Sequence, residues 1–147
     1  MKQDISQKKQ GVDFGGYDSI VIKKHITDIE GGRTLDMAGY PLNVVYAGHV
    51  IISTINGETG EKTYKPMPLV EDTSAEGEET VYKYGTLPEG AVIEGVLYRS
   101  ILKEKPSASI LIDGVVNDKV MKYQLGAIEE AFNAADINII FKHDEEA

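Results

Sequence analysis

The 147-residue sequence contains no cysteine and no tryptophan, and aromatic residues make up only 7% of it. The absence of cysteine excludes disulfides, thiolate nucleophiles and zinc sites built on cysteine. Stability therefore has to come from a packed core or from the association of several copies. The absence of tryptophan argues against a stacking platform for sugars.

Long apolar runs and basic clusters are missing as well. No run approaches the roughly 20 apolar residues that a membrane-spanning helix needs, and the first ten residues, MKQDISQKKQ, lack the apolar stretch of a secretory signal. The net charge is −9 and the basic residues are scattered, whereas nucleic-acid binding needs a clustered basic surface. We therefore expect no nucleic-acid partner, no membrane partner, and a protein that stays in the cell or joins a particle assembled there.

The residues that are present are typical of one folded domain, with 41% hydrophobic and 27% charged positions. Short β-branched or alternating runs dominate, separated by glycine and proline turns. The predicted strands lie at 19–22, 43–52, 63–65, 80–84, 91–98, 107–116 and 137–141. The predicted fold class is mainly β (α+β), a compact β-sandwich or barrel-like domain.

Two of these runs, 44–52 and 108–116, are apolar on both faces. The first is either a strand covered on both faces or two short strands separated by a bulge at Gly48, and Asn56-Gly57 then predicts a hairpin. A small domain has little material to cover such strands, which favours a homotrimer.

One short helix is predicted late in the chain, from apolar residues at helical spacing: Met121, Leu125, Ile128, Phe132 and Ala135. It starts either at a cap formed by Asn117 or Asp118, or near Gly126, because an internal glycine costs a helix up to about 1 kcal/mol.

Residues 1–18 are predicted to form a flexible N-terminal arm, and 19–147 the single β-rich domain. Lys8 and Lys9 give the start of the arm a small positive charge, and Phe14 and Tyr17 are its large apolar groups. We expect the arm to be disordered in the free protein and to order on a partner surface, with the aromatics as anchors and the lysines facing carboxylates. The alternatives are a frayed terminus, or an arm that packs on its own body as an edge strand.

The sequence offers little catalytic chemistry, and we predict no catalytic, metal-binding or cofactor-binding residue. The three histidines, His25, His49 and His143, lack the i, i+2 or i, i+4 partner of a metal site. The acidic segment 71–79 lacks the spacing of a calcium loop. The segment Asp36–Tyr40 is similar to a motif of trimeric dUTPases, but Pro41 stands where those enzymes need aspartate, and their other motifs are missing.

A wider likeness covers residues 64–141, which resemble the head-decoration and head-fibre (auxiliary capsid) proteins of tailed bacteriophages. It rests on the order of GAVIEGVLY (90–98), then ASILIDGVVN (108–117), similar to the family's A-x-V-L-V-x-G-V-V-N strand, then a short helix and INIIF (137–141). The arm and the acidic segment 71–79 lie outside it.

The resemblance implies a structural virion protein without enzymatic activity, located on the capsid exterior after assembly in the host cytoplasm. Its partners would be the major capsid protein and further copies of itself as a homotrimer. Lys8, Lys9, Phe14 and Tyr17 are the candidate capsid contacts. Two alternatives stay open: a monomeric β-sheet binding module for a glycan or peptide, and a dUTPase-like trimeric hydrolase.

Overall fold

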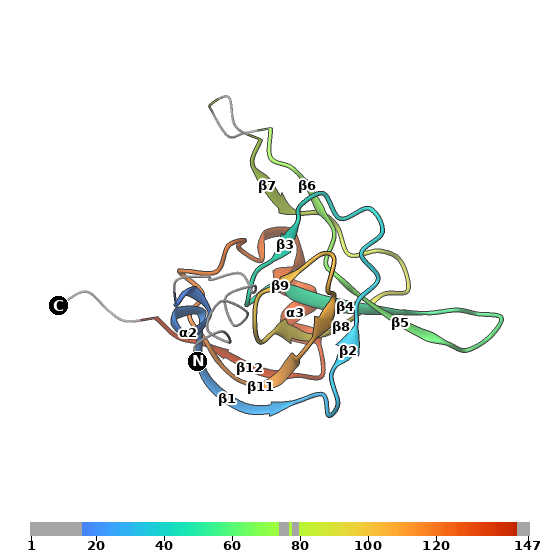
Figure 1. Ribbon diagram of the computed structural model, residues 1–147, viewed down its shortest axis with the longest axis horizontal. Coiled ribbons are helices and arrows are strands. Elements are labelled where there is room, and N and C mark those ends of the chain that lie inside the picture. The colour runs from blue at the N-terminus through green and yellow to red at the C-terminus, as the bar shows by residue number, and fades with distance from the viewer. Residues whose placement is uncertain (1–15, 74–76, 78–79, 144–147) are drawn as a thin grey trace, which may run out of the picture.

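The structure, a computed structural model, describes residues 16–73, 77 and 80–143 (Figure 1). Its elements are α2 (Tyr17–Val21), β1 (Ile22–Asp28), β2 (Arg33–Thr34), β3 (Val44–Val45), β4 (Val50–Ile55), β5 (Lys62–Pro66), β6 (Leu69–Glu71), β7 (Tyr82–Tyr84), β8 (Val92–Leu97), β9 (Ile101–Leu102), β10 (Ser107–Ala108), β11 (Ile110–Val116), the 3₁₀ turn η1 (Gly126–Ile128), α3 (Glu129–Ala134) and β12 (Asn138–Phe141). Lys8, Lys9 and Phe14 of the predicted arm lie outside the described residues.

The main sheet has six strands in the order β1-β11-β8-β4-β5, with β12 also paired to β11. Strand β11 carries β1 along one side. On its other side the first residues of β11 pair with β8, as in Leu111 with Val96, and the last pair with β12, as in Val116 with Phe141. The β11–β12 pair is parallel, and the other pairs of this sheet are antiparallel. β1, β8 and β12 are therefore all held by β11.

Two glycines allow the backbones around β11 to come close. A Cβ on Gly114 would lie 2.4 Å from the carbonyl oxygen of Lys24 in β1, and a Cβ on Gly95 would lie 2.2 Å from the carbonyl oxygen of Leu111. Both separations are far shorter than van der Waals contact. The glycine in the predicted strand 107–116 is thus explained by close approach of β1.

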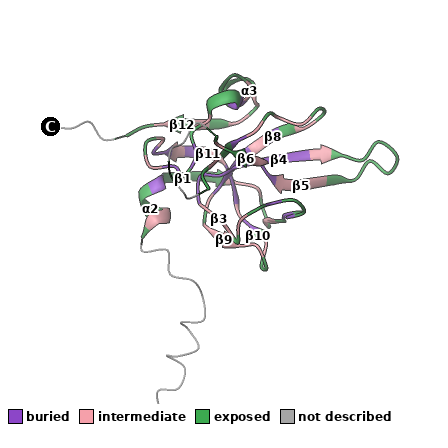
Figure 2. Ribbon diagram, turned by 90° about the horizontal axis from the view of Figure 1, so that it is seen from above, coloured by how far each residue is buried: buried purple, intermediate pink, exposed green. Residues whose placement is uncertain are grey.

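The sheet has an apolar core on each face. Val50, Ile51 and Ile52 of β4 have no exposed surface. Val50 and Ile52 belong to a core shared with α3 and the β6–β7 hairpin, and Ile51 to a second core shared with β3, β10 and the segment 35–40 that follows β2. Buried residues run through the middle of the molecule in Figure 2. The fold is mainly β, as predicted.

This burial removes the physical argument for a homotrimer. Both apolar runs were expected to leave surface that one small domain cannot cover. Within the single chain, however, Ile110, Leu111 and Val116 of β11 are as fully buried as the core of β4. The strands are covered by the chain's own small sheets and by α3.

One local expectation is corrected, and two open alternatives are decided. The run 19–22 was predicted as a strand, but α2 ends at Val21 and β1 begins at Ile22. The run 43–52 forms two strands, β3 and β4, separated at Gly48, which has a φ of 89°. The helical region begins at Gly126, the later of the two predicted starts. In the described ranges, no helix has the length and hydropathy to cross a membrane.

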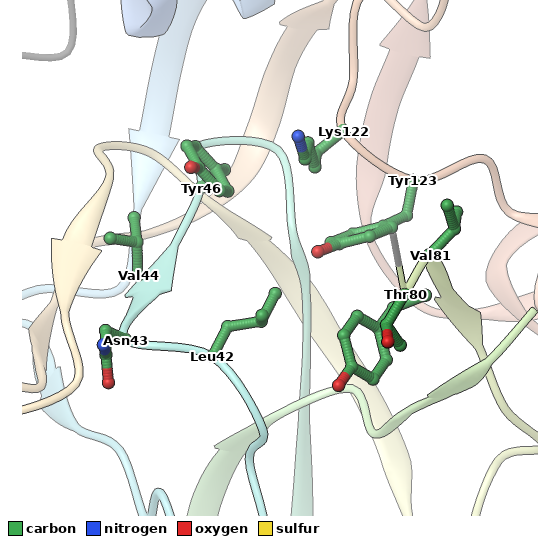
Figure 3. A pocket seen from close by; sticks show the side chains of 9 residues that line it. Leu42, Asn43, Val44, Tyr46, Thr80, Val81, Lys122 and Tyr123 are labelled. Carbon is green, nitrogen blue, oxygen red and sulfur yellow. The ribbon is translucent and has the colours of Figure 1, made fainter. Parts of the chain in front are cut away.

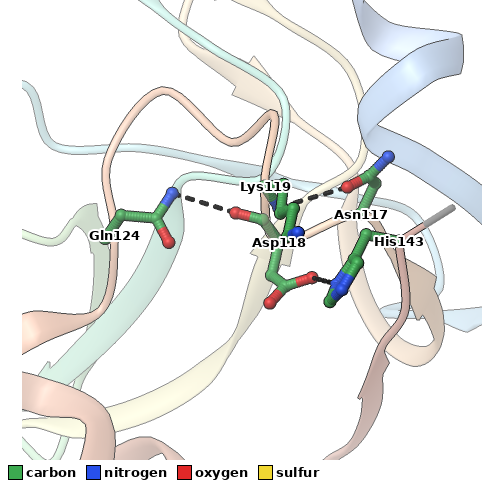
Figure 4. Close-up of polar contacts among 5 residues, drawn as sticks. All are labelled: Asn117, Asp118, Lys119, Gln124 and His143. Atoms are coloured by element: carbon green, nitrogen blue, oxygen red, sulfur yellow. Dashed lines mark hydrogen bonds and ion pairs between the residues drawn. The ribbon is translucent and has the colours of Figure 1, made fainter. Parts of the chain in front are cut away.

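Residues 117–125 form a loop instead of the first turns of a helix (Figure 4). The Asn117 side chain accepts a hydrogen bond from the backbone N–H of Lys119 at 3.1 Å, and Gln124 donates to the Asp118 carbonyl at 2.9 Å. His143, just after β12, donates through Nδ1 to the Asp118 carboxylate at 3.0 Å. The first two contacts lie within the loop, and the third fastens it to the end of β12.

Helix α2 is part of the folded body. The Asp18 carboxylate accepts hydrogen bonds from Ser100 Oγ at 2.5 Å and from the Ser100 backbone N–H at 3.0 Å. Ser100 Oγ in turn accepts a bond from the Ala47 backbone N–H at 2.9 Å. Because Tyr17 and Asp18 are packed, the body begins earlier than the predicted boundary between residues 18 and 19.

We predict that Asp18→Ala lowers the free energy of unfolding by about 1–3 kcal/mol, because it leaves two donors of Ser100 without their carboxylate acceptor. Urea denaturation of the full chain measures this. Asp136→Ala, an exposed aspartate just after α3, is the matched control and should change stability little. Equal losses in the two variants would contradict a fastening role for Asp18.

Candidate binding groove

A groove of about 450 Å³ opens between three segments that are distant in the sequence (Figure 3). Leu42 and Tyr46 flank β3, Val81 and Tyr82 lie at the start of β7, and Tyr123 belongs to the loop 117–125. The volume is within the ordinary range for ligand pockets. The lining is mostly aromatic and aliphatic.

One positively charged side chain, that of Lys122, lines this groove. Lys122 is exposed, and its ammonium lies 5.2 Å from the centre of the Tyr46 ring, within the distance at which a cation is attracted by an aromatic face. Tyr17 packs edge-on against the same Tyr46 ring, with centroids 5.6 Å apart, and donates a hydrogen bond to the Val120 carbonyl at 3.1 Å. The start of α2 therefore abuts two of the segments that form the groove.

Behind the groove, Tyr123 is held by a buried aromatic cluster. Its ring lies 5.6 Å from both Tyr84 and His49, and His49 also contacts the rings of Tyr84 and Tyr40 edge-on. The Tyr84 hydroxyl accepts a hydrogen bond from the Val50 backbone N–H at 2.9 Å. Burial of the Tyr123 phenol, which disfavours its charged form, raises its pKa to about 12. The wall is therefore neutral and anchored to β4.

His49 is a buried, neutral member of this cluster. It is 2% exposed, and Nε2 donates to the Met67 carbonyl at 2.9 Å. No hydrogen-bond partner for Nδ1 is found among the described residues. Burial lowers the pKa of the imidazole to about 4, because the charged form would lose its hydration.

The other residues singled out from the sequence lie apart from the groove. His25 pairs with Asp28 at 3.1 Å and His143 with Asp118, both at the surface. Among the described residues, no group of three His, Asp or Glu side chains is placed to hold a metal. The dUTPase-like segment is a turn in which Asp36 accepts a bond from the Ala38 N–H at 3.1 Å.

Of the four candidate capsid contacts, the structure places only Tyr17. It is half-buried against Tyr46 rather than free on an arm. The groove was missed from the sequence because its walls come from three separate segments. The one sequence signal was the presence of three tyrosines, at positions 46, 82 and 123, but no helical or strand periodicity connects them.

Comparisons with protein-family models, with curated proteins and with solved structures found no match. The fold and the groove therefore have to be interpreted from their own chemistry.

We predict that His49 makes stability fall at acid pH. The unfolded chain binds a proton below about 6.5, whereas the folded chain does so only near 4. The His49 contribution is therefore complete above pH 6.5 and is lost as the pH falls toward 4, by up to ~1.4 kcal/mol for each pH unit.

His49→Gln keeps a donor for the Met67 carbonyl but removes the titration. Its free energy of unfolding, measured by urea denaturation across this pH range, should decline less steeply than that of the unsubstituted protein. Asn133→Gln, an exposed substitution that removes no titrating group, should keep the original slope. An unchanged slope in His49→Gln would show that other groups cause the acid sensitivity.

Proposed function

We propose that the protein is a structural component of a tailed-phage virion that binds the outer surface of the capsid and decorates or stabilises the head. The observation that carries the proposal is that the segments resembling decoration proteins form one packed unit. Segments 90–98, 108–117 and 137–141 contain β8, β11 and β12, and both β8 and β12 pair directly with β11. The resemblance therefore follows a contiguous piece of the fold.

The helix of the resembling segment belongs to the same unit. Phe132 of α3 is buried, and its ring lies 5.3 Å from that of Phe141 in β12. A rigid β body of this kind suits a role in which many copies reinforce a shell, because each copy then gains stability by binding. Such a role requires no catalytic centre.

The edge strand β1 is the surface we assign to the shell. Residues 23–27 of β1 are all exposed, including Lys23, Lys24 and Ile26, and within the part of the chain that the structure describes β1 pairs with β11 alone. This places two lysines and an isoleucine that is 49% exposed on a protein with a net charge of −9. α2 leads directly into β1, so the described chain begins next to this strand (Figure 1).

In this proposal the partner is the major capsid protein, contacted by β1 and by Lys8, Lys9 and Phe14 of the arm, and the location is the capsid exterior. A homotrimer follows from the resemblance alone, since the apolar strands that suggested it are covered within the chain. Particle images that show clusters of three copies at threefold or quasi-threefold axes would support it, and isolated copies elsewhere would refute it.

A monomeric binding module for a peptide or glycan is the second candidate, and the tyrosine-lined groove is the observation that favours it. One simple experiment distinguishes the two candidate functions. A decoration protein should bind empty capsids of the phage that carries its gene, whereas a binding module should leave those particles bare.

We predict that deletion of residues 1–15 leaves a folded protein, because Tyr17 and Asp18 are retained, but weakens its apparent affinity for empty capsids by about tenfold or more, equivalent to ~1.4 kcal/mol. Occupancy is measured by electron microscopy of particles incubated with increasing protein. Unchanged occupancy by the well-folded truncated protein would exclude the arm as a capsid contact.

We further predict that Lys24→Glu slows association with capsids several-fold and reduces the salt dependence of binding, because charges at a binding rim act mainly on encounter. Lys83→Glu is the matched control, since Lys83 is also an exposed strand lysine but lies on β7, away from β1. If both variants slow association alike, net charge rather than the β1 surface is responsible.

A further inference from the structure

The tyrosine-lined groove contains a phenol that the fold leaves without a hydrogen bond. Tyr123 is only 7% exposed, yet no hydrogen-bond partner of its hydroxyl is found among the residues that the structure describes. Figure 3 shows this hydroxyl pointing into the groove. A buried tyrosine hydroxyl usually has a partner. Because the phenol stays protonated near neutral pH, it is placed to donate a hydrogen bond to a ligand.

The preceding residue, Lys122, sets the charge that such a ligand should carry. No carboxylate of the described ranges pairs with its ammonium, which lies 5.2 Å from the centre of the Tyr46 ring. A cationic ligand would be repelled by this ammonium. A phosphate monoester carries nearly two negative charges at neutral pH, which one lysine does not neutralise. The groove therefore suits a ligand with a single negative charge, such as a carboxylate.

We propose that the groove binds the carboxyl terminus of a polypeptide whose last residue is apolar. The terminal carboxylate accepts hydrogen bonds from the Lys122 ammonium and the Tyr123 hydroxyl. The last side chain lies among Leu42, Tyr46 and Val81. The proposal deepens the binding-module candidate and rests on it, whereas capsid binding was assigned to β1 and is a separate property.

The rest of the lining supports a peptide end over a small organic acid. Leu42 and Val81 offer aliphatic surface for the last side chain, and Val81 is 44% exposed. Asn43 and Thr80 line the groove as well, and their amide and hydroxyl can bind the peptide groups that precede the chain end. A groove of about 450 Å³ has room for a ligand of drug size, which is larger than one carboxylate with one side chain.

The absence of tryptophan from the chain allows the ligand to report its own binding. The probe is an acetylated Gly-Gly-Trp peptide with a free carboxyl terminus, titrated with the full chain. We expect its emission to shift to shorter wavelength and to saturate, with a Kd below about 1 mM. The same peptide with an amidated terminus should bind about tenfold more weakly or worse, because the charge-assisted hydrogen bonds are lost. Equal affinities, or no saturation with either peptide, would overturn the proposal.

Two further probes distinguish the sources of an apolar carboxylate. Indolepropionate carries the same ring and carboxylate without peptide groups, and acetylated Trp-Gly-Gly carries the ring away from the chain end. Each should bind about tenfold more weakly than the first peptide or worse, since each loses one set of contacts. Equal affinity of indolepropionate would assign the groove to small organic acids, and equal affinity of Trp-Gly-Gly would show that the last residue is not read. Either result would overturn the proposal.

Two lysines of the loop 117–125 test the charge contact. Lys122→Gln should weaken binding of the free-acid peptide about tenfold and bring its affinity close to that of the amide. Lys119→Gln is the matched control, since Lys119 is exposed on the same loop but does not line the groove. Equal losses in the two variants would show general attraction by positive charge and would overturn the proposal.

Tyr123→Phe tests the hydroxyl without disturbing the wall. The phenylalanine ring keeps the contacts with His49 and Tyr84, so urea denaturation should show unchanged stability. Binding of the free-acid peptide should weaken several-fold, while binding of the amide should change less. Full affinity of the folded variant for the free acid would refute the contact between Tyr123 and the carboxylate.

Two valines test the location of the site. Val81 and Val70 are each 44% exposed, but only Val81 lines the groove. Val81→Glu should weaken the free-acid peptide about tenfold or more, because it places a like charge beside the ligand carboxylate. Val70→Glu has the same net charge and should bind as the unsubstituted chain does. Unchanged binding by a folded Val81→Glu variant, or an equal loss in both, would overturn the assignment to this groove.

Discussion

Close backbone approach along β11 is the constraint on which the rest of the structure depends. β11 accepts β1 on one side and shares its other side between β8 and β12. Gly114 admits the carbonyl of Lys24, and Gly95 admits that of Leu111. A side chain at either glycine would push a neighbouring strand away, because the obstructing atoms belong to the backbone and cannot rotate aside.

The groove inherits its shape from this arrangement. β4 fixes His49 and Val50, and through them the rings of Tyr84 and Tyr123. The loop 117–125 carries Tyr123 and leaves β11 directly, so its position follows from the end of that strand. The groove is thus supported by the same central strands that hold the two cores together.

Local patterns in the sequence predicted much of this fold, because alternation and turn residues act over short distances. The Asn56-Gly57 hairpin, the helix start at Gly126 and β12 are examples. Helix α2 was not predictable, because its β-branched residues favour a strand and it is held by Ser100, 82 positions from Asp18. The groove depends on contacts of the same long range, which a sequence pattern does not contain.

The strands β1 and β12, which both pair with β11, make the sheet easier to open by force in one direction than in another. Val116 pairs with Ile22 at the start of β1 and with Phe141 at the end of β12, so both strands leave the sheet at the same end of β11. Tension that pulls these two strands apart peels their ladders open one hydrogen-bonded pair at a time. A load that anchors the opposite end of β11, near Ile110, shears all the pairs of a ladder together. The domain is therefore mechanically anisotropic. It resists a load anchored near Ile110, which acts along the strands, far better than tension applied between the start of β1 and the end of β12.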